Sequence, residues 1–254
     1  MRSERNERRT AAVVLAAGQG KRMESPIQKQ FMLLGGRPMV YYSLKAFEDS
    51  EVDDVILVTG KDDVDYCAEN IVRQFSLSKV RAVVPGGKER YHSVYEGLKA
   101  IERLYRNEMI PDTGLSVLIH DGARPFLNQR IINASVAGAQ KYRACVVGMP
   151  VKDTIKLTDE NGFCKETPDR RNLWMIQTPQ AFEYKLVREA YDRMFSREEY
   201  QRGVTDDAMV VEKMTDTKVR IIQGDYRNIK LTTPEDMILA RAFFQEEQSR
   251  LGRE

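Results

Sequence analysis

Positively charged residues gather directly after an apolar run near the start of the chain. Residues 11–17 (AAVVLAA) are followed by the turn 18–20 (GQG), then by Lys21 and Arg22, with Lys29 a few residues further on. Small residues let backbone N–H groups approach an anion, because no Cβ stands in the way. Three cations beside such a turn can neutralise more charge than a single phosphate carries. The stretch therefore predicts a binding site for a triphosphate.

Two better-known phosphate-binding loops do not fit this stretch. The dinucleotide fingerprint requires a third glycine where Met23 stands, and the Walker pattern requires Ser or Thr where Arg22 stands. Pro26 argues against a regular helix directly after the glycines, so residues 23–30 are predicted to form an irregular loop that can fold over a ligand. A tight strand-to-helix turn with solvated cations is the structural alternative.

The elements that must position these residues follow from the hydrophobic pattern. Apolar runs alternate with segments of helical spacing, which predicts a largely parallel sheet with helices on both faces. We expect strands at residues 11–17, 52–59, 79–84, 115–120, 144–150 and 218–223, and helices at 39–47, 63–75, 94–105, 204–212 and from 234 to about 248. Ligands of such sheets bind beyond the carboxyl ends of the strands. The glycine turn 18–20, Gly60 and Gly86-Gly87 should all lie at that edge.

The segment 86–93 (GGKERYHS) is a second candidate for contact with a nucleotide. Gly86 and Gly87 permit close approach to a flat ligand, and Ser93 can cap the following helix or hydrogen-bond a base. A turn with an ordinary helix cap explains the same residues equally well. His92 is expected to be a surface or cap residue and not a catalyst.

An acidic residue follows the fourth expected strand. Asp121 comes directly after residues 115–120 (LSVLIH) and precedes the small residues Gly122 and Ala123. A carboxylate at the tip of a buried strand is well placed to hold Mg²⁺ against phosphates. The alternative is that Asp121 pairs with Arg124 or caps the next helix.

Residues 153–169 predict a β-arm that stands off the domain. Residues 154–157 alternate polar and apolar, and Asn161-Gly162 is typical of a hairpin turn between two strands. Such an arm cannot bury itself alone and often packs on a partner chain. We therefore expect residues 151–175 to form a dimerisation arm.

Three further polar or charged residues have ordinary structural explanations, and two of them, Arg170 and Thr205, also lie where a phosphate could bind. Arg170 is a fork of N–H donors suited to a phosphate monoester, although a surface arginine is equally compatible with its position. Thr205 lies at or near the start of the helix expected at 204–212, where backbone donors are available. Lys230 lies just before the helix start formed by residues 232–236 (TTPED).

Composition limits the possible classes. The chain has 254 residues, 42% hydrophobic content and a net charge of +2, which predicts one domain over 10–248 after a disordered charged tail at 1–9. The small net charge gives no indication of a nucleic-acid partner. Three scattered cysteines, with no signal peptide and no apolar stretch that could span a membrane, predict a cytoplasmic protein. Only two histidines are present, so a multi-histidine metal cage is not expected.

Residues 15–23 (LAAGQGKRM), with Pro26 and 29–31 (KQF), resemble the signature of sugar-nucleotide pyrophosphorylases and cytidylyltransferases. That resemblance implies a three-layer α/β/α Rossmann-like nucleotidyltransferase fold, with a mostly parallel twisted sheet and a protruding β-arm. Residues 120–125 (HDGARP) and 169–182, with DRRNLW and QTPQAF, narrow the similarity to methylerythritol phosphate cytidylyltransferases. The similarity extends from Thr10 to about Ala242, and Lys88 departs from the family's commoner aspartate at a ribose or base contact.

The resemblance implies transfer of CMP from CTP to 2-C-methyl-D-erythritol 4-phosphate, which gives the 4-diphosphocytidyl derivative and pyrophosphate in non-mevalonate isoprenoid synthesis. It also implies Mg²⁺ as cofactor and a homodimer in which the arm completes the neighbour's substrate site. The implied catalytic residues are Arg22 and Lys29. The implied nucleotide-binding residues are Ala16, Ala17, Gly18, Gly20, Lys21, Gly86, Gly87, Ser93 and Gly122. The implied substrate-binding residues are Asp121, Thr154, Arg170, Thr205 and Lys230, with Asp121 also at the metal.

Three other functions are weighed against this one. Ribitol-5-phosphate cytidylyltransferases are similar throughout, and residues 169–174 favour the methylerythritol enzymes. A non-catalytic nucleotide-binding module would be indicated by loss of Lys29 or Asp121, and both are present. A nicotinamide-dependent dehydrogenase is disfavoured by Met23, which stands where the third glycine belongs.

Overall fold

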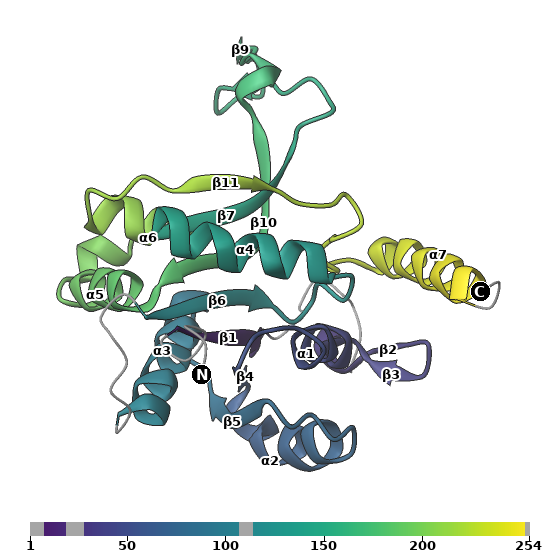
Figure 1. Cartoon of the computed structure of the whole chain (residues 1–254). Coiled ribbons are helices and arrows are strands. Elements are labelled where there is room, and N and C mark those ends of the chain that lie inside the picture. Colours follow the sequence, from purple (N-terminus) through teal and green to yellow (C-terminus); the bar gives the residue numbers. More distant parts are fainter. Residues whose placement is uncertain (1–7, 19–27, 107–113, 252–254) are drawn as a thin grey trace.

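A seven-stranded sheet forms the centre of the protein (Figure 1). The computed structural model describes residues 8–18, 28–106 and 114–251. The strand order is β11-β7-β10-β6-β1-β4-β5. The strands are β1 (Arg9–Ala16), β4 (Asp54–Thr59), β5 (Val80–Pro85), β6 (Leu115–Asp121), β7 (Ala144–Pro150), β10 (Trp174–Glu183) and β11 (Arg220–Gln223). Within these strands β10 alone runs antiparallel to its neighbours, so the prediction of a mostly parallel sheet is confirmed.

Strand β1 lies near the middle of the sheet and pairs with β4 on one side and β6 on the other. Its apolar run is continuous because both faces are covered by helices. Ala11 and Val13 belong to one buried cluster, whereas Ala12 and Val14 belong to the other. The run predicted as a fully buried strand is therefore confirmed, and the strand begins at Arg9, inside the segment expected as a tail.

Helices on both faces complete the three layers that the resemblance implied. One face packs against α3 (Arg90–Tyr105), α5 (Tyr184–Phe195) and α6 (Asp207–Met214). The other packs against α1 (Met39–Glu48), α4 (Gln129–Tyr142) and α2 (Val64–Cys67), which continues as a π-helix over Ala68–Arg73. The helix expected at 63–75 is thus present as one continuous segment that changes from α- to π-helical hydrogen bonding after Cys67.

A third apolar cluster lies beside the ends of the strands. Helix α7 (Pro234–Leu251) packs there against the hairpin of β2 (Leu33–Leu34) and β3 (Arg37–Pro38). Pro234 is the first residue of α7, as the sequence predicted, and Asp236 accepts hydrogen bonds from the N–H groups of Thr232 and Thr233. None of the helices in the described ranges has the length and apolar composition needed to cross a bilayer.

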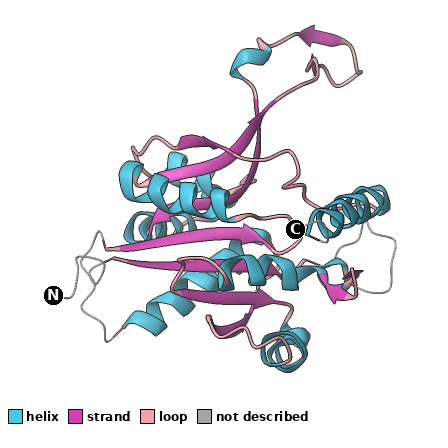
Figure 2. Cartoon of the chain, turned by 45° about the vertical axis from the view of Figure 1, so that its right-hand side comes forward, coloured by secondary structure: helices cyan, strands magenta, loops and turns pink. Residues whose placement is uncertain are grey.

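The chain between β7 and β10 forms an arm that stands clear of the sheet and its helices (Figures 1 and 2). The arm carries β8 (Leu157–Thr158) and β9 (Cys164–Glu166), paired antiparallel, and Gly162 has a φ of 84° in the turn between them. The predicted hairpin is confirmed, but its first strand is shorter than expected, since residues 154–156 are not in a strand. Phe163 is 73% exposed at its tip.

Candidate active site

A pocket of about 180 Å³ opens at the carboxyl edge of the sheet. It brings together residues that lie far apart in the sequence, because β1, β5 and β6 are parallel and end at the same edge. The predicted site residues that line it are Ala16, Ala17, Gly18, Lys29, Gly87, Ser93, Asp121 and Lys230. Gly20, Lys21 and Arg22 lie outside the described residues.

The two glycines after β5 are held against the turn after β1. The Gly86 N–H donates to the Thr59 carbonyl at 2.8 Å, and the Gly87 N–H donates to Ser93 Oγ at 3.2 Å. A Cβ on Gly86 would lie 2.5 Å from Ser93 Oγ and 2.7 Å from the Ala17 Cβ. Only glycine therefore allows these two segments to approach so closely.

Ser93 does not cap helix α3, contrary to one of the predicted alternatives. The helix begins at Arg90, with Glu89 as the N-cap, so Ser93 lies in the first turn. Glu89 and His92 form a reciprocal capping box, in which His92 Nδ1 accepts from the Glu89 N–H at 3.2 Å. The prediction that His92 is a cap residue is confirmed.

Gly122 does not line the pocket, but it bonds to Leu15, which does. Its N–H donates to the Leu15 carbonyl at 2.9 Å, and a Cβ there would lie 3.0 Å from the same oxygen. Gly122 therefore continues the pairing between β1 and β6 past the last residue of β6.

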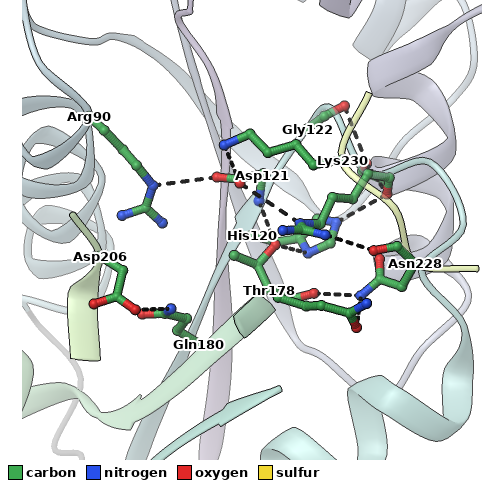
Figure 3. A network of polar contacts seen from close by, with 12 residues as sticks. Arg90, His120, Asp121, Gly122, Thr178, Gln180, Asp206, Asn228 and Lys230 are labelled. Carbon is green, nitrogen blue, oxygen red and sulfur yellow. Dashed lines mark hydrogen bonds and ion pairs between the residues drawn. The ribbon is translucent and has the colours of Figure 1, made fainter. Parts of the chain in front are cut away.

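Asp121 is buried and surrounded by three cations (Figure 3). One carboxylate oxygen lies 3.4 Å from Arg90 Nε, and the other lies 2.8 Å from Lys230 Nζ and 3.9 Å from Arg124 Nε. Burial would raise the pKa of Asp121, but the charges of Arg90, Lys230 and Arg124 outweigh burial and hold the pKa well below its usual range. The carboxylate is therefore ionised at neutral pH. The pairing of Asp121 with Arg124, which the sequence offered as an alternative to metal binding, is present as one contact of this larger cluster.

Arg90 connects this cluster to a second buried acid. Its two terminal nitrogens each donate to a carboxylate oxygen of Asp207 at 2.7 Å. Asp207 is 0% exposed and also accepts a hydrogen bond from the Tyr191 hydroxyl at 2.6 Å. A bidentate pair of this kind fixes both position and orientation, so Arg90 joins the start of α3 to the start of α6 and to β6.

A chain of neutral hydrogen bonds fixes Asp121 from the other side (Figure 3). The Asp121 N–H donates to Thr178 Oγ1 at 3.1 Å, and that oxygen lies 3.0 Å from His120 Nδ1. The second ring nitrogen, Nε2, lies 3.3 Å from the Arg124 carbonyl. Because a carbonyl only accepts, Nε2 carries the proton and Nδ1 accepts from Thr178. Burial lowers the pKa of His120 to about 4, so the ring is neutral.

Thr205 lies near the start of α6, as expected, but is not its cap. Asp206 is the N-cap and accepts from the Met209 N–H at 2.9 Å, whereas Thr205 is exposed and lies one residue further out. The N–H groups of Asp207 and Ala208 donate to Gln180 Oε1 at 3.0 and 2.9 Å. The first donors of this helix are thus already used within the protein.

Thr154 and Arg170 lie on the arm and do not line the pocket of their own chain. Both are exposed, and Arg170 Nη1 donates to the Lys152 carbonyl at 2.8 Å. The structure therefore does not bring these two predicted substrate residues together with Asp121 and Lys230 in one protomer.

The pocket could hold one divalent cation only if the substrate supplied some of the metal ligands. No group of three or more His, Cys, Asp or Glu side chains in the described residues is placed to hold a metal ion. Mg²⁺ typically binds one or two carboxylates together with substrate phosphates and water. The ionised carboxylate of Asp121 fits that requirement.

Comparisons with known proteins all match this chain to one family, and each match covers nearly the whole chain. The model of the 2-C-methyl-D-erythritol 4-phosphate cytidylyltransferase family matches residues 10–246. The enzyme of that name from Lachnoclostridium phytofermentans is 47% identical over 241 residues, which are 94% of this chain and 98% of the relative. The corresponding Lachnospira eligens enzyme is 48% identical over 92% of this chain and 98% of its own.

Among solved structures, 4-diphosphocytidyl-2C-methyl-D-erythritol synthase from Anaerococcus prevotii is similar, with a TM-score of 0.79 and 33% identity. The match covers 94% of this chain and 97% of that one. A match of this extent, in sequence and in fold, shows family membership. The chain belongs to the 2-C-methyl-D-erythritol 4-phosphate cytidylyltransferase family.

Proposed function

We propose that this protein transfers CMP from CTP to 2-C-methyl-D-erythritol 4-phosphate, giving the 4-diphosphocytidyl derivative and pyrophosphate. The observation that carries the proposal is the pocket lined by Lys29, Lys230 and Arg90, in which Lys230 and Arg90 contact an ionised Asp121 beside the close-packed glycine segments. Both reactants are anions, so a site for them must supply fixed positive charge in a confined space. Family membership supports the same reaction.

The reaction is an in-line displacement at phosphorus. An oxygen of the substrate phosphate attacks the α-phosphorus of CTP, and the bond from that phosphorus to the bridging oxygen of the β-phosphate breaks as pyrophosphate leaves. The attacking phosphate is already anionic, so no general base is required. Arg22 and Lys29 would stabilise the charge on the pentacoordinate phosphorus and on the leaving group.

The glycine segments would hold the nucleotide. Ala16, Ala17, Gly18, Gly20 and Lys21 would surround the triphosphate, and Gly86, Gly87 and Ser93 would approach the ribose and base. This assignment is supported by the close approach of the two segments: a Cβ on Gly86 would lie 2.7 Å from the Ala17 Cβ, so both segments can contact one bound nucleotide.

Lys230 would bind the phosphate of the acceptor together with Thr205. Lys230 Nζ lies 2.8 Å from a carboxylate oxygen of Asp121. We infer that this pair opens when the reactants bind, so that the ammonium group turns to the acceptor phosphate while Asp121 faces the metal. Arg90 stays bonded to Asp207 throughout and keeps Asp121 in place.

Mg²⁺ belongs to the proposal as the cofactor, with Asp121 as its protein ligand. When bound, the ion neutralises charge on the triphosphate oxygens. The protein's own contribution is to keep the Asp121 carboxylate ionised and oriented, which the surrounding cations and the Thr178 hydroxyl do.

A homodimer is the second part of the proposal. The arm presents exposed apolar side chains, including Phe163 and Leu157, which a partner chain could cover. Thr154 and Arg170 would then reach the phosphate in the partner's pocket. We also propose a cytoplasmic location, where Cys67, Cys145 and Cys164, all free thiols, would stay reduced.

A turnover assay tests the proposal. Pyrophosphate release from each nucleoside triphosphate is measured with Mg²⁺ and either methylerythritol phosphate or ribitol 5-phosphate as acceptor. We expect turnover with CTP and methylerythritol phosphate and little with the other pairs. Preference for ribitol 5-phosphate would indicate the rival function, and no turnover with any pair would contradict enzymatic activity.

A further inference from the structure

The segment between β11 and α7, residues 224–233, connects the base of the arm to the pocket. It leaves the edge strand β11, passes the point where the arm joins the sheet, and carries Lys230 before α7 begins (Figure 1). Tyr226 and Lys230 are four residues apart in this segment. Tyr226 contacts the arm base at Pro150, and Lys230 contacts Asp121 in the pocket.

Tyr226 attaches the segment to the arm. Its hydroxyl donates to the Pro150 carbonyl at 2.9 Å, at the last residue of β7. The Lys152 Nζ lies 3.5 Å from the centroid of the Tyr226 ring, a cation–π contact. The Lys152 carbonyl in turn accepts from Arg170 Nη1 at 2.8 Å. Tyr226 and Lys152 therefore hold the segment against residues 150–152 of the arm base, and Arg170 separately joins the returning chain of the arm to the Lys152 backbone.

The middle of the segment is fixed to β10 and to the turn after β6. Gln177 Nε2 donates to the Asp225 carbonyl at 2.8 Å, and Asn228 Nδ2 donates to the Thr178 carbonyl at 2.8 Å. Arg124 Nη1 donates to the Asn228 carbonyl at 2.7 Å. Asn228 is fully buried, so this central anchor does not depend on the arm.

We propose that Tyr226 and Lys152 are positioning residues for the phosphorylated acceptor: they set the distance between the arm base and Lys230. This inference rests on the proposed function, in which Lys230 binds the acceptor phosphate in its own pocket and Arg170 of the same chain serves the partner's pocket. The contact between Tyr226 and Lys152 thus links the segment that carries Lys230 to the arm that carries Arg170. These two residues would bind the acceptor phosphate in two different pockets.

Loss of the Tyr226 and Lys152 contacts should weaken acceptor binding because it lowers the population of protein in the binding-competent arrangement. Without those contacts the segment stays fixed, because Gln177 donates to the Asp225 carbonyl, Asn228 donates to the Thr178 carbonyl, and the N–H of the buried Leu231 donates to the Ala123 carbonyl at 2.9 Å. The arm base is then no longer held at a fixed distance from Lys230, so the arm samples arrangements in which Arg170 is displaced from the partner's pocket, and the apparent affinity for the acceptor falls by the fraction of arms that remains competent. CTP is held by other segments, after β1 and β5, and its binding is unaffected. Tyr226 and Lys152 are both exposed, so their removal leaves no cavity in the core.

The experiment compares steady-state kinetics of the full-length enzyme with Tyr226→Ala, Tyr226→Phe and Lys152→Met. We expect Tyr226→Ala to raise KM for methylerythritol phosphate about tenfold, equal to ~1.4 kcal/mol, with KM for CTP unchanged. Lys152→Met and Tyr226→Phe each remove one of the two contacts and should raise the same KM about threefold.

Tyr142 provides a matched control, because it is also exposed and also lies against a lysine, with Lys141 Nζ 5.1 Å from its ring centroid, at the end of α4. Tyr142→Ala and Lys141→Met should leave both KM values unchanged. If Tyr226→Ala does not fold, Lys152→Met gives the same test.

Unchanged KM for the acceptor in Tyr226→Ala and Lys152→Met would overturn the inference, as would an equal rise in both KM values. An equal effect of Tyr142→Ala would also overturn it. The proposed function is tested separately by the wild-type protein: if that protein transfers CMP while these variants behave like wild type, only the positioning role fails.

Discussion

Replacing Arg90 with methionine tests the buried ion pair between α3 and α6. The substitution keeps the length and apolar stem of the side chain but removes both 2.7 Å hydrogen bonds to Asp207. Asp207 is fully buried, and without Arg90 its one remaining side-chain partner among the described residues is the Tyr191 hydroxyl.

The magnitude follows from that burial. Removing one partner of a buried pair leaves an uncompensated charge and typically costs about 3–5 kcal/mol. A domain of ordinary stability has a free energy of unfolding of about 5–15 kcal/mol, so at the middle of both ranges Arg90→Met should remove roughly 40% of it. Arg90→Met/Asp207→Asn removes both charges and keeps an acceptor for Tyr191, so it should recover at least about half of the loss.

These changes in the free energy of unfolding are measured by urea unfolding at pH 7, with circular dichroism as the readout. Arg103→Met, an exposed arginine on the same helix, is the matched control and should change the free energy of unfolding by less than about 0.5 kcal/mol. A cost below about 1 kcal/mol for Arg90→Met would refute the argument. So would a double variant whose loss equals the sum of the losses measured for Arg90→Met alone and Asp207→Asn alone.

Three other predictions concern the site. Arg22→Ala or Lys29→Ala should each lower the rate of CMP transfer by ~10² or more in a turnover assay, and full turnover would remove that residue from the mechanism. Arg170→Ala should raise KM for the phosphorylated acceptor, with Arg171→Ala, its exposed neighbour, as control; a change in CTP affinity alone would contradict the substrate assignment. His120 has a folded pKa of about 4 against 6.5 in the unfolded chain, so its contribution to stability is complete above pH 6.5 and is lost as pH falls toward 4. Urea unfolding between pH 4.5 and 7.5 should therefore show a slope, worth up to about 3 kcal/mol, that His120→Gln lacks; equal slopes in both proteins would contradict the buried neutral ring.

The parts of the fold that were predictable depend on neighbours in sequence. The buried strand β1, the glycine turns and Asp121 at the tip of β6 all follow from hydrophobic runs and from the residues directly after them. Parallel strands end at one edge, so these local patterns were enough to predict that Gly18 and Gly87 lie together, whereas the family resemblance was needed to add Lys29 and Asp121 to the same site.

Helix starts were less accurate because several residues near each start can act as the cap. A cap was one of two roles expected for Ser93, but Glu89 is the N-cap of α3. Thr205, expected at or near the N-cap of α6, lies directly before the actual cap, Asp206. A cap is decided by the backbone path into the helix, which depends on tertiary packing around it. Short-range composition does not contain that information.

The pairings that complete the site are not local. Arg90 and Asp207 are 117 residues apart, and an aspartate in the first turn of a helix ordinarily faces solvent. The sequence pattern also does not show that β10 inserts between β6 and β7, which places Thr178 and Gln180 beside Asp121 and α6. Such contacts become visible only when the sheet order is known.

A crystal structure of the protein with CTP and Mg²⁺ tests the central claim most directly, since the claim is that one cationic pocket holds both anions. We predict the triphosphate beside Lys29 and the residue 16–18 turn, the base near Gly86-Gly87, and the ion within reach of the Asp121 carboxylate. A nucleotide bound elsewhere, with Arg22 and Lys29 directed toward bulk water, would contradict the account.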